Sequence, residues 1–158
     1  MSVSSASLAG KVAFVQGGSR GIGAAIVRRL AAEGASVAFT YVSSADKSRA
    51  LAAELEGAGA SILALHADSA DAAALVAAVD EAAARFGRID ILVNNAATNP
   101  QFCNVLETDL GAFQKTVDVN IRGYYFMSIE GGKLMKEHGG GSIINVASIN
   151  GVSPGEFQ

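Results

Sequence analysis

A glycine-rich turn between residues 16 and 23 constrains the fold of this chain more than any other stretch. The apolar run 12–15 leads into Gln16-Gly17-Gly18-Ser19-Arg20-Gly21-Ile22-Gly23, and an amphipathic pattern follows it. Glycine tolerates positive φ and has no side chain to keep a ligand away from the backbone. A helix after the turn points its free N–H groups and positive dipole end at it, which favours a phosphate there. The stretch predicts a phosphate-binding turn, although glycines that serve only tight packing would leave the same pattern.

Short apolar runs alternate with helical patterns along the rest of the chain. The expected strands are residues 11–16, 37–41, 61–66, 89–93 and 142–147. The expected helices cover about 22–33, a segment through Leu51 and Leu55, a segment through Leu75 and Phe86, and a long helix over 108–136. Strand–helix alternation with short links predicts an α/β fold with a doubly wound parallel sheet of right-handed βαβ units.

The helical spacing also predicts which side chains are buried. In the first helix we expect Ile22, Ile26 and Leu30 on the inner face. In the long helix the expected inner residues are Leu110, Phe113, Val117, Ile121 and Tyr124. Ser69 is well placed to be the N-cap of the third helix.

The composition is that of a soluble globular domain without nucleic-acid or membrane features. Half of the 158 residues are hydrophobic and the net charge is −3. There is no Lys/Arg stripe for nucleic acid and no apolar run of the ~18 residues that a bilayer span needs. Cys103 is the single cysteine, which fits a reducing compartment, and we expect a cytoplasmic protein. Residues 1–9 do not read as a signal peptide and are expected to be a tail before one domain over 10–158.

Two motifs resemble those of the short-chain dehydrogenase/reductase family. Gly17-x-x-x-Gly21-Ile22-Gly23 is similar to its cofactor-binding turn, and Asn94-Asn95-Ala96-Ala97 looks like its Asn-Asn-Ala-Gly. The family usually has Thr where this chain has Gln16. The resemblance covers the whole chain, and its first half most resembles 3-oxoacyl-carrier-protein reductases, although related carbonyl reductases look the same. It implies a three-layer Rossmann-type sheet lacking the family's last strands and helices, with a nicotinamide dinucleotide at the carboxyl ends of the strands.

The resemblance also assigns roles to single residues. Asp68 stands where the family's carboxylate accepts a hydrogen bond from the adenine amino group, although an acid favoured by the helix dipole is an alternative. Asn94 and Ala96 would line the cofactor, or the Asn pair would only satisfy loop amides. The full set expected to bind cofactor is Gly17, Ser19, Arg20, Gly21, Ile22, Gly23, Tyr41, Ser43, Asp68, Ser69, Asn94 and Ala96.

The end of the second strand favours NADP(H) over NAD(H). An NAD site needs an acid there to accept from the ribose hydroxyl, and here the position is Tyr41, with no carboxylate before Asp46. Arg20 could pair with a 2′-phosphate, and Ser43 could donate a hydrogen bond to it. An exposed surface arginine is the alternative for Arg20.

The catalytic part of the family site is represented by Ser148 and Asn120. By the resemblance, Ser148 holds the oxygen of a carbonyl or alcohol substrate, and Asn120 serves a proton relay from within the long helix. A core Asn with satisfied hydrogen bonds is the alternative for Asn120. The family's Tyr-x-x-x-Lys is absent, since Tyr41, Tyr124 and Tyr125 have no Lys four residues later. His66 and His138 do not replace it, and no metal site is expected.

Two functions remain open from the sequence. The first is an NADP(H)-dependent oxidoreductase acting on a ketone, an aldehyde or a 3-oxoacyl group. The second is a non-catalytic dinucleotide-binding fragment, because loss of a general acid lowers rates by about 10²–10⁴. Phe113, Val117, Tyr124 and Phe126 and the strand edge at 143–146 lack cover in a chain this short, so we expect association with another chain, or further sequence that covers them. The resemblance implies a homo-oligomer, because the family commonly assembles through the long helix.

Overall fold

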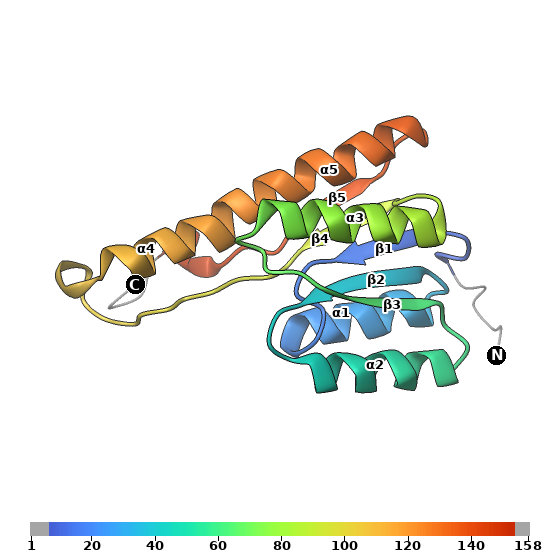
Figure 1. Ribbon diagram of the computed structural model, residues 1–158, viewed down its shortest axis with the longest axis horizontal. Coiled ribbons are helices and arrows are strands. Elements are labelled where there is room, and N and C mark those ends of the chain that lie inside the picture. Colours follow the sequence, from blue (N-terminus) through green and yellow to red (C-terminus); the bar gives the residue numbers. More distant parts are fainter. Residues whose placement is uncertain (1–6, 154–158) are drawn as a thin grey trace.

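A computed structural model describes residues 7–153 and contains one parallel sheet in the order β3-β2-β1-β4-β5 (Figure 1). The strands are β1 (Val12–Val15), β2 (Ser36–Tyr41), β3 (Ile62–His66), β4 (Ile91–Asn94) and β5 (Ser142–Asn145). Every neighbouring pair is parallel. The predicted doubly wound α/β fold is thus confirmed, and each strand lies within two residues of its expected bounds.

Helices form a layer on each face of the sheet. In Figure 1, α1 (Gly21–Ala32) and α2 (Ala45–Gly57) cover one face, and α3 (Ala72–Phe86) and α5 (Gly123–Glu137) cover the other. Each layer has its own core, because successive strand side chains point to opposite faces. Val15 of β1 packs in the cluster with Val27 of α1, whereas Phe14 packs in the cluster with Met127 of α5.

The chain changes direction at β1. From β1 it winds outward through β2 to β3, and then crosses back by α3 to β4 on the other side of β1. The loops after β1 and β4 therefore diverge at neighbouring carboxyl ends. A crevice at such a switch point is where ligands bind in open α/β sheets.

The long helix differs from its expected course. It consists of α4 (Leu110–Val117), a π-helical turn (Asp118–Arg122) and α5, preceded by a short 3-10 turn (Val105–Glu107). The side chains expected inside it include Leu110, Phe113 and Ile121, which are 82%, 58% and 64% exposed. The buried residues are instead Val119, Gly123, Met127, Gly131 and Met135. The prediction was wrong because it followed large apolar side chains, whereas two glycines lie on the inner face.

Two smaller expectations also fail. Ile22 at the start of α1 is 66% exposed, and the inner face there consists of Gly23, Ala24 and Val27. The N-cap of α3 is Asp71, whose carboxylate accepts from the N–H groups of Ala73 and Ala74 at 2.9 and 3.1 Å. Ser69 is buried two residues earlier.

Some surfaces of the described chain carry apolar residues. All four residues of β5 are exposed, with Ile143 and Ile144 at 40% and 44%. α4 projects beyond the end of the sheet (Figure 1).

Among residues 7–153, no helix combines the length and the apolar character needed to cross a bilayer. Of the predicted tail, residues 1–6 lie outside the described part, and Leu8 donates its N–H to the carbonyl of Glu33 at the end of α1.

Candidate functional site

The glycine turn after β1 is held from both neighbouring strands. The N–H of Gly17 donates to Thr40 Oγ1 at 3.0 Å, and that of Gly18 donates to the Thr40 carbonyl at 2.9 Å. From the other side, Asn95 Nδ2 donates to the carbonyl oxygens of Gln16 and Gly17 at 3.2 and 3.0 Å. Gly17 has φ +72°, a conformation that side chains other than glycine rarely adopt. The turn is therefore a fixed backbone surface at the start of α1.

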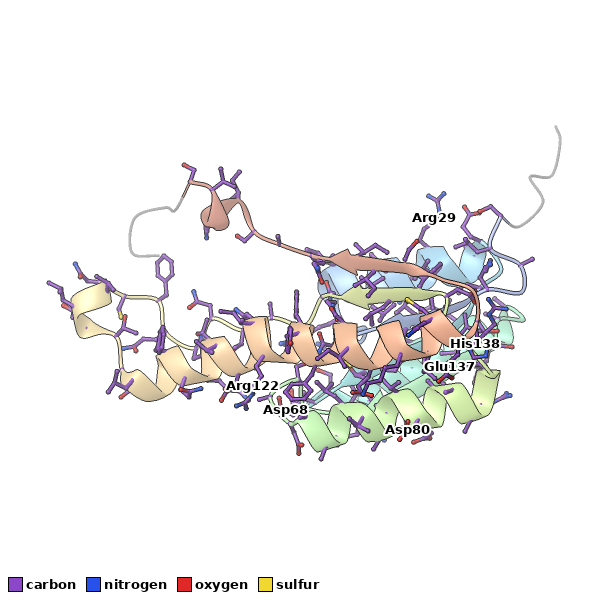
Figure 2. The ribbon with its side chains drawn as sticks, turned by 90° about the horizontal axis from the view of Figure 1, so that it is seen from above. Arg29, Asp68, Asp80, Arg122, Glu137 and His138 are labelled. Atoms are coloured by element: carbon purple, nitrogen blue, oxygen red, sulfur yellow. The ribbon has the colours of Figure 1, made fainter. Side chains whose placement is uncertain are left out.

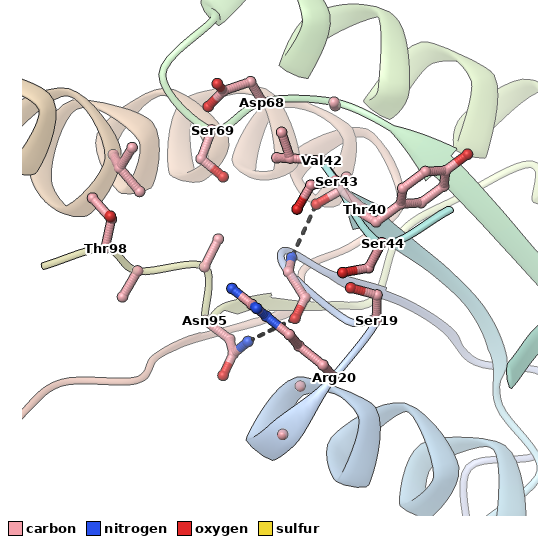
Figure 3. A pocket seen from close by; sticks show the side chains of 18 of the residues that line it. Ser19, Arg20, Thr40, Val42, Ser43, Ser44, Asp68, Ser69, Asn95 and Thr98 are labelled. Atoms are coloured by element: carbon pink, nitrogen blue, oxygen red, sulfur yellow. Dashed lines mark hydrogen bonds between the residues drawn. The ribbon is translucent and has the colours of Figure 1, made fainter. Parts of the chain in front are cut away.

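A cavity of about 590 Å³ opens over this turn (Figure 3). Its walls come from the turn, the end of β2, the β3–α3 loop, the loop after β4 and α4. The lining residues are Gly17, Ser19, Arg20, Gly21, Ile22, Gly23, Thr40, Tyr41, Val42, Ser43, Ser44, Ala67, Asp68, Ser69, Asn95, Ala96, Ala97, Thr98, Lys115 and Val119. The structure thus brings together eleven of the twelve residues predicted to bind a cofactor, all except Asn94.

Asn94 does not line this cavity. Its side chain is fully buried on the α5 side, where Nδ2 donates to Asn145 Oδ1 at 2.8 Å and to Ser128 Oγ at 3.1 Å. Asn95 takes the place by the cavity and holds the glycine turn. Asn94 is the last residue of β4 and Asn95 the first of the loop after it, so the two side chains have different surroundings.

The charges around the cavity favour an anion near Arg20. Arg20 is exposed, lies directly before α1, and forms no ion pair with any residue from 7 to 153. In Figure 3 its side chain extends over the hollow, with the hydroxyls of Ser19, Ser43 and Ser44 around the same cavity. The first turn of α1 contains no acidic residue. Free guanidinium, hydroxyl and helix N–H donors together suit phosphate groups.

The acidic group of the cavity, Asp68, is already paired. Its Oδ1 accepts from the N–H of Ala70 at 2.9 Å, and Lys115 Nζ lies 3.1 Å from Oδ2. The Ala70 N–H is the main reason why the pKa of Asp68 lies below its ordinary value; burial opposes this shift and Lys115 adds to it. Asp68 is therefore an ionised acceptor at neutral pH.

A second cavity of about 710 Å³ adjoins the first, with Ile22, Asn95 and Ala97 in the walls of both. It brings the two predicted catalytic residues, Ser148 and Asn120, into one hollow. Ser148 is exposed after β5, and its Oγ accepts from the N–H of Asn150 at 3.2 Å at the start of a 3-10 turn (Ile149–Gly151). The remaining walls are formed by Tyr124, Tyr125, Ser128, Asn145, Val146 and Ala147.

The side chain of Asn120 ties the π-helical turn to the loop after β4. Its Oδ1 accepts from the Thr98 N–H and its Nδ2 donates to the Thr98 carbonyl, both at 2.9 Å. Both ends of the amide are thereby used, and the π-helical turn is the distortion that points this residue at the loop. The structure supports a positioning role for the side chain, and the proton relay stays a prediction.

Among the described residues, neither Tyr124 nor a histidine offers an acid or base for Ser148. Tyr124 donates its phenol O–H to the Val146 carbonyl at 3.2 Å, and burial raises its pKa, which disfavours the phenolate. His138 ends α5 far from Asp68, as Figure 2 shows. Within residues 7–153 no three His, Cys, Asp or Glu side chains gather as a metal site would require.

Gln16 introduces an unusual feature below the turn. Its side chain is fully buried, and neither amide atom has a hydrogen-bond partner within the described residues. Burying an amide in this way lowers stability by about 1–3 kcal/mol. The site therefore carries a local energetic penalty below the glycine turn.

Comparison with known proteins gives the same assignment as the motifs. The family model of the short chain dehydrogenases matches residues 11–158. A 3-alpha-(or 20-beta)-hydroxysteroid dehydrogenase of Mycobacterium bovis is 41% identical over 146 residues, which are 92% of this chain and 54% of that protein. The chain thus spans about half the length of this curated relative.

Solved structures are similar over the same region. A short-chain dehydrogenase/reductase from Serratia marcescens is 51% identical with a TM-score of 0.86, covering 91% of this chain and 58% of that one. A short chain dehydrogenase from Burkholderia cenocepacia in complex with NADP is 39% identical with a TM-score of 0.89, covering 96% and 60%. With the family model matched over nearly all of its residues, the chain belongs to the short-chain dehydrogenase/reductase family.

Proposed function

We propose that this chain binds NADP(H) over the glycine turn and contributes to hydride transfer between that cofactor and a small carbonyl or alcohol substrate. The observation that carries the proposal is the close approach of the glycine turn to α1 at Gly23. A Cβ on Gly23 would lie 2.1 Å from the Gly17 carbonyl oxygen, so only glycine lets the turn and α1 meet this closely. The relative from Burkholderia cenocepacia, solved with NADP, supports the cofactor by analogy.

Each part of the cavity would hold one part of the cofactor. The backbone from Gly17 to Gly23 and the start of α1 would hold the pyrophosphate. Arg20 and Ser43 would hold the 2′-phosphate, and Asp68 would accept from the adenine amino group. The cofactor supplies the hydride, and Ser148 in the adjoining cavity would orient the substrate oxygen. The substrate class proposed is a ketone, an aldehyde or a 3-oxoacyl group, and the protein is proposed to act as a homo-oligomer.

Calorimetric titration with NADPH and NADH tests the proposal. We expect both to bind, with NADPH about tenfold tighter, the effect of one strong charge-assisted contact to the extra phosphate. R20Q should remove most of that difference. R29Q, which changes an exposed arginine on the far part of α1 paired to Glu33, should leave it unchanged. Absence of heat with both dinucleotides would refute the proposed function.

Turnover by the 158-residue polypeptide should be slow even where cofactor binds. Reduction of a carbonyl needs a proton donor beside the substrate oxygen, and no Tyr in this sequence has a Lys four residues later. Loss of a general acid lowers the rate by about 10²–10⁴. NADPH oxidation with a panel of ketones and aldehydes measures this, alongside a full-length relative as the positive control. Turnover at the relative's rate would contradict the expectation.

A further inference from the structure

Lys115 joins α4 to the opposite wall of the cavity. Its Nζ lies 3.1 Å from Asp68 Oδ2 and 3.5 Å from Oδ1, although the two residues are 47 positions apart in the sequence. Both residues line the cavity, and their side chains are 45% and 37% exposed. The contact is therefore part of the site wall and open to a ligand.

Two further contacts fix the same wall. Arg122 donates to the Ala70 carbonyl at 3.2 Å, and Gly123 packs so tightly that a Cβ there would lie 2.5 Å from the Ser69 carbonyl oxygen. The backbone of the β3–α3 loop is thus held independently of Lys115, which leaves Lys115 to act on the Asp68 side chain alone.

The carboxylate keeps acceptor capacity toward the cavity. An ionised carboxylate has about four acceptor directions and no donor. In Asp68 some of these directions accept from the Ala70 N–H and the Lys115 ammonium. A purine amino group can donate to a remaining direction, whereas a carbonyl oxygen at the same place on the ring would be repelled.

We propose that Lys115 is a positioning residue that holds the Asp68 carboxylate as a fixed acceptor, so that the dinucleotide site selects adenine over hypoxanthine. Hypoxanthine carries a carbonyl where adenine carries its amino group. Without Lys115 the carboxylate can rotate or take up water, and the distinction between the two bases weakens. This inference rests on the proposed dinucleotide site and names what determines its base selectivity.

Binding of NADPH and of its hypoxanthine analogue to the 158-residue chain tests the inference. The readout is the ratio of the two Kd values. A general loss of structure or charge weakens the binding of both ligands, and its effect cancels in the ratio. We expect K115M to lower the preference for adenine by about fivefold, the effect of one hydrogen bond. K115R should retain the preference, and K115M should have no further effect in a D68N background.

A matched control is K133M, which removes a lysine paired to Glu130 on α5 outside both cavities, and it should leave the ratio unchanged. A salt titration tests the same point without a variant. Salt screens the half-exposed Lys115–Asp68 ion pair, so raising its concentration should also lower the preference for adenine. If K115M weakens both dinucleotides equally, or salt leaves the ratio constant, the inference is wrong while the proposed function stands. If the wild-type chain binds neither dinucleotide, both the inference and the proposed function are wrong.

Discussion

Replacing Gly23 by alanine is expected to weaken NADPH binding by about 100-fold. The new methyl group would lie 2.1 Å from the Gly17 carbonyl oxygen and 2.7 Å from Asn95 Nδ2, so the turn must move away from α1. Such overpacking typically costs about 1–3 kcal/mol, and 3 kcal/mol placed on the turn corresponds to about 100-fold in Kd. Calorimetric titration of G23A with NADPH measures the effect.

Gly132 offers the matched control for this substitution. It lies within α5, and a Cβ there would meet no atom nearby. G132A should bind NADPH like the wild type and gain up to about 1 kcal/mol of stability from helix propensity. Circular dichroism shows whether G23A keeps its helices. A folded G23A that binds as tightly as G132A would mean that the turn does not hold the cofactor.

The parts of the fold that follow from local chemistry could be predicted from the sequence. The five strands are short apolar runs bounded by turn residues, and the glycine turn requires residues without Cβ atoms. The buried face of α5 could not be found in this way. Gly123 and Gly131 lie inside because the helix approaches Ser69 and Leu92 closely, and hydrophobicity counts glycine as neutral.

Site residues could be predicted from the sequence where the residue type alone indicates the role. They could not be predicted where the role depends on the direction of a side chain or on a contact between distant residues. Asn94 and Asn95 are identical in type, but Asn94 ends β4 with its side chain buried, whereas Asn95 begins the following loop at the cavity. Lys115 went unnoticed because its partner, Asp68, is distant in sequence. Gln16 departs from the family's Thr, and its unsatisfied burial could not be foreseen from that difference.

Replacing Asp90 by asparagine is expected to lower the free energy of unfolding by about 3 kcal/mol, as for other buried ion pairs that lose one partner. The Asp90 side chain is 6% exposed and holds the amino ends of the strands together. It accepts from the Val12 N–H at 2.9 Å, from Arg88 Nε at 3.0 Å and from Lys11 Nζ at 3.4 Å. An asparagine would leave Arg88 without its countercharge. Thermal or urea unfolding of D90N measures the loss, with D80N on the exposed surface of α3 as the control.

The pH dependence of that difference identifies its electrostatic origin. Burial alone would raise the pKa of Asp90, but the Val12 N–H, Arg88 and Lys11 outweigh burial and hold it below its ordinary value. A group with a lowered folded pKa stabilises fully above its unfolded pKa, near 4, and this stabilisation is lost as pH falls toward the folded pKa. The gap between wild type and D90N should therefore be constant from pH 7 to about 5 and narrow below about 4. A gap that stays the same down to pH 3, or is no larger than that of D80N, would show that the carboxylate charge does not hold the strand ends together.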